Sequence, residues 1–213
     1  MCFGKMPNKE IVKAFDISLI LYAEHSFNVS TFTARTITSS LSDIHSAITG
    51  AIGSLKGPLH GGANEAVMHM MNKIKKPENA LKWINNVLDK KEVVMGFGHR
   101  VYKKGDSRVT TIEKYFKKIS KIKNDKKFHK IHDIVKKVMI KRKDIHPNVD
   151  FPTGPTYHLM GFDTDFFTPI FVLSRITGWS AHIMEQHMAN KLIRPLSKYS
   201  GEKHRKVILL NQR

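Results

Sequence analysis

Three ionisable residues stand in local surroundings that are unusual for charged side chains. His60 precedes two glycines, His99 follows Gly-Phe-Gly, and Asp150 lies between two apolar residues in a proline-framed segment. Ionisable groups in apolar, glycine-rich, non-helical segments are typical of ligand-binding sites, where pKa values are shifted. Taken singly, each of the three fits better with a hydrogen-bonded loop residue. Together they predict proton abstraction α to a carbonyl, with the carboxylate as base and imidazoles that hydrogen-bond developing oxyanions.

Other kinds of catalytic or metal site have little support in the sequence. His129 and His132 share one helix face, but no third ligand is near and the cationic helix repels a divalent ion, so we predict a solvated face there. The patterns GxSxG, GxxxxGK[ST], HExxH and CxxC are absent. The lone cysteine, Cys2, cannot form an internal disulfide, and no signal-peptide pattern precedes the first helix. We therefore predict no metal site and a cytoplasmic location.

Positive charge is concentrated in the middle of the chain. The 213 residues include 36 Lys and Arg against 18 Asp and Glu, a formal net charge of +18. Residues 73–150 hold 23 basic and 9 acidic residues, so this segment alone carries +14. Few aromatic residues stand among its lysines as stacking platforms, and lysine outnumbers the arginine that reads bases and phosphates bidentately. We predict no specific nucleic-acid binding and keep non-specific anion binding as a weaker alternative.

Apolar residues recur at helical spacing along most of the chain, which predicts an all-α fold. Only residues 92–99 have a short β-like character, and no apolar run is long enough to span a membrane. Residues 146–152 are predicted as loop or extended chain, because each proline disfavours the α region for the residue before it. The predicted helices cover residues 9–21, two stretches between 30 and 56, 65–74, 78–89, 109–121, 126–141, 156–160, 166–176 and 179–191.

At the three ionisable residues the sequence resembles the citrate synthase family, and most closely its 2-methylcitrate synthase branch. The two most specific segments are KGPLHGGANEAV, from Lys56 to Val67, and GFGHRVY, from Gly96 to Tyr102. Further matching segments lie in order over nearly the whole chain: Leu21 to Phe32, Asn148 to Asp150, Phe167 to Arg175, Gly178-Trp179 and Ile193 to Pro195.

The resemblance implies a reaction and a role for each of the three residues. Asp150 would remove a proton from the α-carbon of propionyl-CoA or acetyl-CoA, and His60 would hydrogen-bond the thioester oxygen. His99 would polarise the carbonyl of oxaloacetate, and hydrolysis of the new thioester would release CoA. The family's chemistry uses no metal and no separate cofactor.

The resemblance also implies which residues bind the substrates. His25 would bind oxaloacetate, and Arg108, Arg175 and Arg194 would bind carboxylates, with Arg194 reaching into the partner subunit's site. A guanidinium fork suits this task because it pairs both oxygens of a carboxylate. The CoA would lie along Val93, Val94, Met95, Gly96 and Phe97, with the glycine admitting its bulk.

A homodimer with two domains in each subunit is the implied architecture. Residues 1–62 and 161–213 would belong to the large domain and residues 63–160 to the small, CoA-side domain. The first residue aligns inside the large domain, so that domain is expected to be incomplete, and the face of Ile11, Phe15 and Leu19 is expected to lack its cover. The alternative to an active acyltransferase is an inactive truncated remnant, or an interaction fragment that needs a separate N-terminal piece.

Overall fold

The computed structural model describes residues 2–102 and 104–213. Within them all regular structure is helical, apart from one isolated antiparallel bridge between Phe97 and Pro147, and the all-α prediction is confirmed. The α-helices are α1 (Lys9–Ala23), α2 (Val29–Ser39), α3 (Ile44–Leu55), α4 (Ala63–Ile74), α5 (Pro77–Asp89), α6 (Ser107–Ile122), α7 (Lys127–Lys143), α8 (Asp150–Met160) and α9 (Phe167–Met188), and the short 3₁₀ helices are η1 (Thr164–Phe166) and η2 (Leu210–Gln212).

Side-chain caps fix where several helices begin. Asn8, Asn28, Asp43 and Asp106 each accept a hydrogen bond from a backbone N–H in the first turn of the following helix. Such a bond satisfies a donor that has no partner inside the helix. Two of these caps, Asn28 and Asp106, lie beside the candidate site and so fix the approach of α2 and α6 to it.

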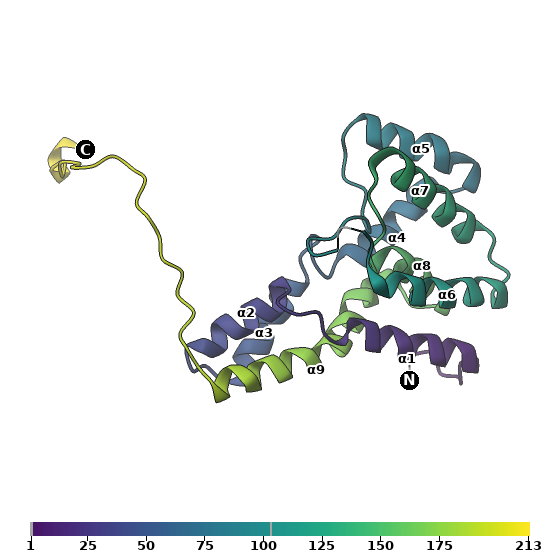
Figure 1. The fold of residues 1–213 in the computed structure, drawn as a ribbon, viewed down its shortest axis with the longest axis horizontal. Coiled ribbons are helices and arrows are strands. Elements are labelled where there is room, and N and C mark those ends of the chain that lie inside the picture. The colour runs from purple at the N-terminus through teal and green to yellow at the C-terminus, as the bar shows by residue number, and fades with distance from the viewer. Residues whose placement is uncertain (1, 103) are drawn as a thin grey trace.

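The helices form two groups that meet near the middle of the molecule (Figure 1). In one group α2 and α3 pack on each other and on α9; in the other α4 packs on α8, α5 on α7, and α6 on α8. α1 connects the groups, because it packs on both α9 and α6. After α9 the chain runs as an extended segment away from the helices (Figure 1).

The apolar core has two clusters, and neither follows the predicted domain limits. The larger cluster joins Ile11 and Ala14 of α1 to the buried faces of α4–α8 and to Phe167 and Ile170 of α9. The smaller one gathers around Trp179 and takes residues from α1, α2, α3, α6 and α9. The predicted domain boundaries after residues 62 and 160 stay a prediction. Apolar contacts of both clusters join residues on the two sides of these boundaries.

The α1 face that was expected to be uncovered is packed. Ile11 is buried, and Phe15 and Leu19 contact the larger core cluster. The Phe15 ring lies 6.3 Å from that of Tyr157 and 5.4 Å from that of Phe162, centroid to centroid. The expectation was wrong because α6, α8 and α9 supply the cover.

The predicted loop around Asp150 is also wrong in part, since Asp150 is the first residue of α8. Pro152 stands in the first turn of that helix, where a backbone N–H has no helical partner and proline costs no hydrogen bond. Before it, Asn148 N–H donates to the Gly96 carbonyl and Gly98 N–H donates to that of His146, both over 2.9 Å. This bridge ties the loop that carries His99 to the start of the helix that carries Asp150.

α9 continues through Gly178, where two separate helices had been predicted. Gly178 is buried against the end of α1, and a Cβ at this position would clash with the carbonyl oxygen of Ala23. Close packing of the two helices requires glycine here and holds it inside a continuous helix despite its low helix propensity. The continuous α9 joins Phe171 and Arg175, which line the site, to Trp179 in the smaller core cluster.

His132 departs from the predicted solvated face. It is 1% exposed, and its ring stacks on Phe151 at 4.6 Å between centroids. The lysines of α7 occupy other faces, and the sequence spacing alone did not separate His132 from them. None of the described helices combines the length and the hydropathy needed to cross a membrane.

Candidate active site

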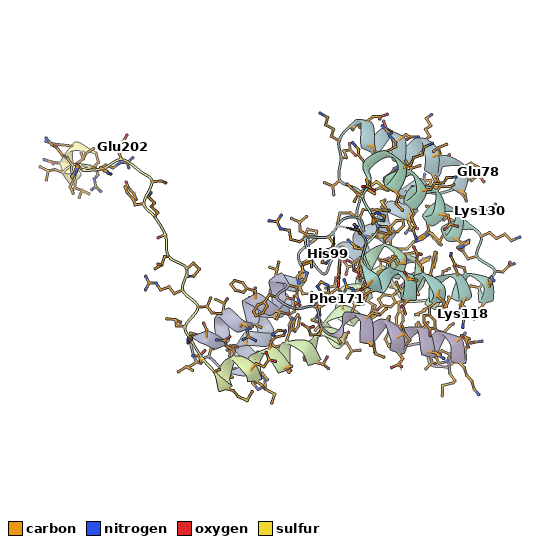
Figure 2. The ribbon with its side chains drawn as sticks, viewed as in Figure 1. Glu78, His99, Lys118, Lys130, Phe171 and Glu202 are labelled. Carbon is orange, nitrogen blue, oxygen red and sulfur yellow. The ribbon has the colours of Figure 1, made fainter. Side chains whose placement is uncertain are left out.

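A cavity of about 90 Å³ lies where the two helical groups meet. Figure 2 places His99 and Phe171, which both line it, in this region. A wider hollow of about 500 Å³ opens beside it and shares His25, His60 and Asp150 with it. The structure thus brings six of the seven predicted catalytic and oxaloacetate-binding residues to one cavity. Its lining residues are His25, Asn28, His60, His99, Arg108, Asn148, Val149, Asp150, Phe171 and Arg175.

Asp150 is a carboxyl group adapted to accept a proton near neutral pH. Burial raises its pKa from 3.8 to about 6, against the opposing effects of the Tyr22 hydrogen bond and of Arg108 and Arg175. The Tyr22 hydroxyl donates to Asp150 Oδ1 over 2.6 Å, and the Asp150 N–H donates to Asn148 Oδ1 over 3.1 Å. At pH 7 the group is mostly ionised and can take a proton from a bound molecule.

His60 is held as a neutral imidazole in one tautomer. Burial, with a contribution from Arg175, lowers its pKa to about 4. The backbone N–H of Ser30 donates to His60 Nε2 over 3.3 Å, so this nitrogen is an acceptor and the ring hydrogen is on Nδ1. The hydroxyl oxygen of Ser30, Oγ, lies 2.8 Å from the same nitrogen of His60. This oxygen accepts a hydrogen bond from Trp179 Nε1. Nδ1–H is therefore the donor available to a ligand.

His99 has the opposite tautomer. Its Nδ1 accepts from the backbone N–H groups of Val101 and Tyr102, over 3.1 and 3.3 Å, so the neutral ring carries its hydrogen on Nε2. Burial lowers the pKa of His99, and Arg108 lowers it further against the effect of Asp106. The bonds from its own loop fix the ring, which leaves Nε2–H as a second donor for a ligand.

His25 also lines the cavity and lies beside His99. The two rings meet edge to face, with centroids 5.0 Å apart, and His25 Nε2 is 3.1 Å from the Tyr102 hydroxyl. Burial, followed by the charge of Arg108, lowers the pKa of His25 to about 4. Like His60, it is neutral above pH 5, so the cavity's positive charge comes from arginine.

Arg108 is already paired within the protein. Its Nε and Nη2 donate to the two carboxylate oxygens of Asp106 over 3.0 and 2.7 Å, and its Nη1 donates to the Leu21 carbonyl over 3.3 Å. Asp106 is fully buried and also accepts from the backbone N–H of Val149. Asp106 thereby holds the Nε–Nη2 edge of the guanidinium and fixes its orientation in the cavity wall.

Arg175 is a buried cation whose hydrogen-bond donors are only partly satisfied by the described residues. It is 2% exposed, its Nε donates to the Tyr22 carbonyl over 2.6 Å, and its Nη1 is buried with no hydrogen-bond partner among the described residues. Burial and the nearby charge of Arg108 lower its pKa to about 10, so the guanidinium stays charged at pH 7. A buried cation with an unused donor predicts an anionic ligand, because leaving it unpaired is costly.

The amino-acid sequence is similar to those of known proteins over the full length of the chain. A family model described as the citrate synthase C-terminal domain matches residues 1–196. The chain belongs to the citrate synthase family. It is 57% identical to 2-methylcitrate synthase 2 of Corynebacterium glutamicum and 55% identical to a citrate synthase of Mycolicibacterium smegmatis, over 100% and 98% of its own length.

A solved citrate synthase has the same fold. The Thermoplasma acidophilum enzyme, in a ternary complex with carboxymethyl coenzyme A and oxaloacetate, is 39% identical over 99% of the chain, with a TM-score of 0.91. The chain spans 57% of that protein and about the same share, 57% and 56%, of the two curated relatives. It therefore represents the C-terminal part of the family's fold.

The segment predicted to lie along CoA in this citrate synthase family member is only partly accessible. Val93 is 79% exposed, Val94 is buried in the core, and Met95 and Phe97 pack against it. Gly96 has a φ of +82°, and a Cβ there would meet Val67 and Phe151 within 3 Å. The glycine is thus required for packing on α4 and α8. The placement of CoA along Val93 to Phe97 stays a prediction.

Arg194 is the predicted residue that the cavity does not include. It lies exposed in the extended segment after α9, outside the residues that line the cavity. Within the described part of the chain, no three His, Cys, Asp or Glu side chains are grouped as a metal site.

Several residues that shape the citrate synthase site were not predicted. Tyr22 bonds Asp150, Ser30 fixes the His60 tautomer, Asp106 orients Arg108, and Asn148 caps the Asp150 N–H. Asn148 and Asp106 stand within two residues of a predicted site residue, and their polar types at those positions were an available signal. Tyr22 and Ser30 lie far in sequence from Asp150 and His60, and the matching segment Leu21 to Phe32 that contains them gave neither of them a role.

Proposed function

We propose that this chain carries the catalytic residues of an enzyme that condenses propionyl-CoA or acetyl-CoA with oxaloacetate and releases CoA. Its relatives are named as 2-methylcitrate synthases and citrate synthases, and a structural neighbour holds a CoA derivative and oxaloacetate. The observation that carries the proposal is a buried, unpaired arginine, Arg175, in one cavity with a carboxylate of raised pKa. This pairing fits an anionic substrate and a proton-abstraction step.

Formation of the carbon–carbon bond takes one proton from the acyl-CoA and gives one proton to the former carbonyl oxygen of oxaloacetate, so the protons balance. Asp150 takes a proton from the α-carbon of the acyl-CoA, and His60 Nδ1–H hydrogen-bonds the thioester oxygen on which negative charge develops. The α-carbon attacks the carbonyl carbon of oxaloacetate, while His99 Nε2–H bonds the carbonyl oxygen and supplies its proton. Water then cleaves the thioester to give the tricarboxylate and free CoA.

Oxaloacetate is held by cations that match its two carboxylates. Arg175 offers Nη1, Arg108 offers the edge that Asp106 does not occupy, and His25 and His99 line the same cavity. Neutral imidazoles suit this position, because a proton donor that stays uncharged does not have to be desolvated as an ion. Arg194 is proposed to reach the site of a second subunit in a homodimer.

Oxaloacetate-dependent release of CoA thiol tests the function. The chain is assayed with propionyl-CoA and with acetyl-CoA, beside Asp150→Asn. Thiol release that is lost in the variant supports the enzyme, and the ratio of the two rates gives the acyl preference. No thiol above background with either acyl-CoA from a folded preparation would favour the inactive remnant, which no observation on the site supports.

A further inference from the structure

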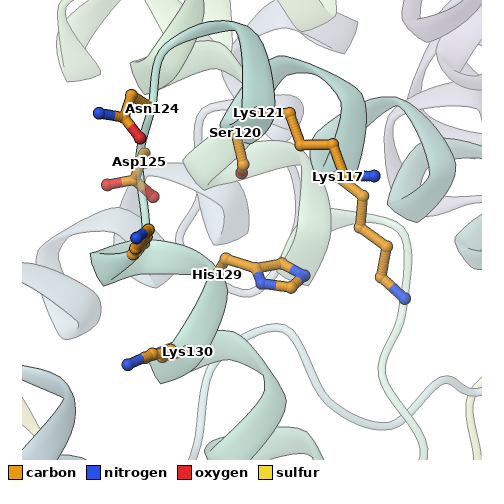
Figure 3. A pocket seen from close by; sticks show the side chains of 8 residues that line it. Lys117, Ser120, Lys121, Asn124, Asp125, His129 and Lys130 are labelled. Atoms are coloured by element: carbon orange, nitrogen blue, oxygen red, sulfur yellow. The ribbon is translucent and has the colours of Figure 1, made fainter.

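A second hollow lies between the end of α6 and the start of α7. It encloses about 540 Å³, and Figure 3 shows it bounded by the two helices and the turn that joins them. At a rise of 1.5 Å per residue, twelve residues of α6 set Ser120 about 18 Å from Arg108, so this hollow is separate from the cavity described above. Its lining residues are Lys117, Ser120, Lys121, Asn124, Asp125, Lys126, His129 and Lys130.

Ser120 distinguishes this hollow from the rest of the lysine-rich surface. It is 3% exposed, and its Oγ has no hydrogen-bond partner among the described residues. Other helical hydroxyls in this chain, those of Thr38 and Thr49, donate to the carbonyl four residues earlier. Figure 3 shows the Ser120 side chain directed from α6 into the space facing His129. A buried donor left unused in a lined hollow points to a ligand.

The charge around Ser120 indicates an anion. Lys117, Lys121, Lys126 and Lys130 line the hollow, and none of them makes an ion pair in the part of the chain that the structure describes. The carboxylate of Asp125 is engaged, because its Oδ2 accepts from the backbone N–H of Phe128. Four cations against one anion leave a local excess of three positive charges.

The start of α7 adds to this field. α7 is 17 residues long, and its N-cap Lys126, together with His129 and Lys130, lines the hollow. The N-terminus of a helix carries a partial positive charge that favours negatively charged oxygen atoms. His129 stands on the same first turn; its Nε2 is buried, has no hydrogen-bond partner among the described residues, and lies 3.7 Å from Oδ2 of Asp133.

We propose that this hollow binds the phosphate group of a small phosphorylated molecule. Ammonium groups, a hydroxyl and a helix N-terminus supply hydrogen-bond donors, and phosphate oxygens are acceptors. The volume falls within the range of small-molecule sites and exceeds that of a single phosphate, so the hollow has room for a further group of the ligand. The site is separate from the proposed catalytic function and does not depend on it.

Amide NMR shifts locate and measure the binding. The chain is titrated with pyrophosphate at constant ionic strength, and the shifts of residues 117–130 are followed apart from those of the active-site cavity. We expect saturable shifts in 117–130. Ser120→Ala should weaken the binding about tenfold to a hundredfold, since it removes one hydrogen bond to a charged group without changing the net charge. The variant should melt no lower than the parent chain, because the Ser120 hydroxyl has no partner to lose.

A matched pair of lysine variants separates a built site from diffuse charge. Lys117→Gln with Lys121→Gln should weaken binding more than tenfold, whereas Lys82→Gln with Lys90→Gln, an equal charge loss at exposed positions in α5 and at its C-cap, should change it less than twofold. Equal effects of the two pairs, or no saturable shift in 117–130, would overturn the proposal. A single-stranded oligonucleotide that binds more tightly than pyrophosphate and is equally sensitive to both pairs would show diffuse polyanion binding instead.

Discussion

Tyr22 and Asp150, 128 residues apart in sequence, are joined by a 2.6 Å hydrogen bond from the phenol to the carboxylate. Tyr22 is the penultimate residue of α1 and Asp150 the first of α8, so the bond connects the two helical groups at the cavity. It stabilises the ionised carboxylate and lowers its pKa, while burial raises it, and the balance is about 6. The strength of the proposed base is therefore set by a residue on another helix.

Removal of this bond should move the pH dependence of the proposed reaction. Asp150 must be ionised to act, so kcat/KM falls as the pH drops through about 6. Tyr22→Phe takes away an effect that lowers the pKa, so the acid limb should shift to higher pH while the rate at pH 8 stays close to that of the parent. Tyr115→Phe, in a buried tyrosine away from the cavity, should leave the limb in place. An unmoved limb in Tyr22→Phe would show that Asp150 does not set it.

The raised pKa of Asp150 also predicts a stability cost at neutral pH. The carboxyl pKa rises from 3.8 to about 6 on folding, so its contribution to stability is fully present below pH 4 and is lost as the pH rises through 6. Asp150→Asn, which stays neutral, should therefore melt above the parent chain at pH 8, with the difference shrinking at pH 4. Differential scanning calorimetry at the two pH values measures this, and a variant that melts lower at pH 8 would contradict it.

Arg175 should act mainly on oxaloacetate binding. Its Nη1 has no hydrogen-bond partner among the described residues, so Arg175→Gln removes a charged contact with substrate and relieves a buried cation. A charge-assisted contact of roughly 3 kcal/mol corresponds to an increase in KM for oxaloacetate of about 100-fold. Arg142→Gln, at an exposed ion pair of α7, is the matched control and should leave KM unchanged. Similar KM values for the two variants would remove Arg175 from the site.

Asp106 should matter more for stability than an exposed partner of arginine. Its carboxylate is fully buried, pairs with Arg108 and accepts the Val149 N–H, so Asp106→Asn leaves a guanidinium without its anion. We expect a loss of about 3 kcal/mol in the free energy of unfolding in urea. Asp89→Asn breaks the exposed pair with Arg142 and should cost less than about 1 kcal/mol. Equal losses would mean that burial does not decide the strength of the Asp106 pair.

The sequence predicted the helical class and most helix positions, because the apolar spacing on each helix is local information. It misplaced the start of α8 and the break in α9, where the outcome depends on distant packing. Gly178 lies inside α9 because the close contact with the carbonyl of Ala23 leaves no room for a side chain. Asp150 can begin α8 because Pro152 falls in the first turn, which tolerates proline. Neither relation is visible in a window of neighbouring residues.

For the site, sequence reasoning found the residues whose own surroundings are unusual, and the family resemblance added the arginines. It did not find the residues that act on them from other helices. Ser30, which determines which nitrogen of His60 carries the hydrogen, and Tyr22, which tunes Asp150, lie in ordinary amphipathic helices. Their effect arises only once tertiary packing brings α1 and α2 to the cavity.

The central claim is that Asp150 is the base in a condensation of an acyl-CoA with oxaloacetate. The most direct measurement is the rate of oxaloacetate-dependent CoA thiol release at pH 8 by the parent chain, by Asp150→Asn and by Asp16→Asn, a control on α1 outside the cavity. We predict a rate in Asp150→Asn that is lower by about 10²-fold to 10⁴-fold, as expected for loss of a general base, with Asp16→Asn unchanged. Thiol release by Asp150→Asn at the parent rate would contradict the account.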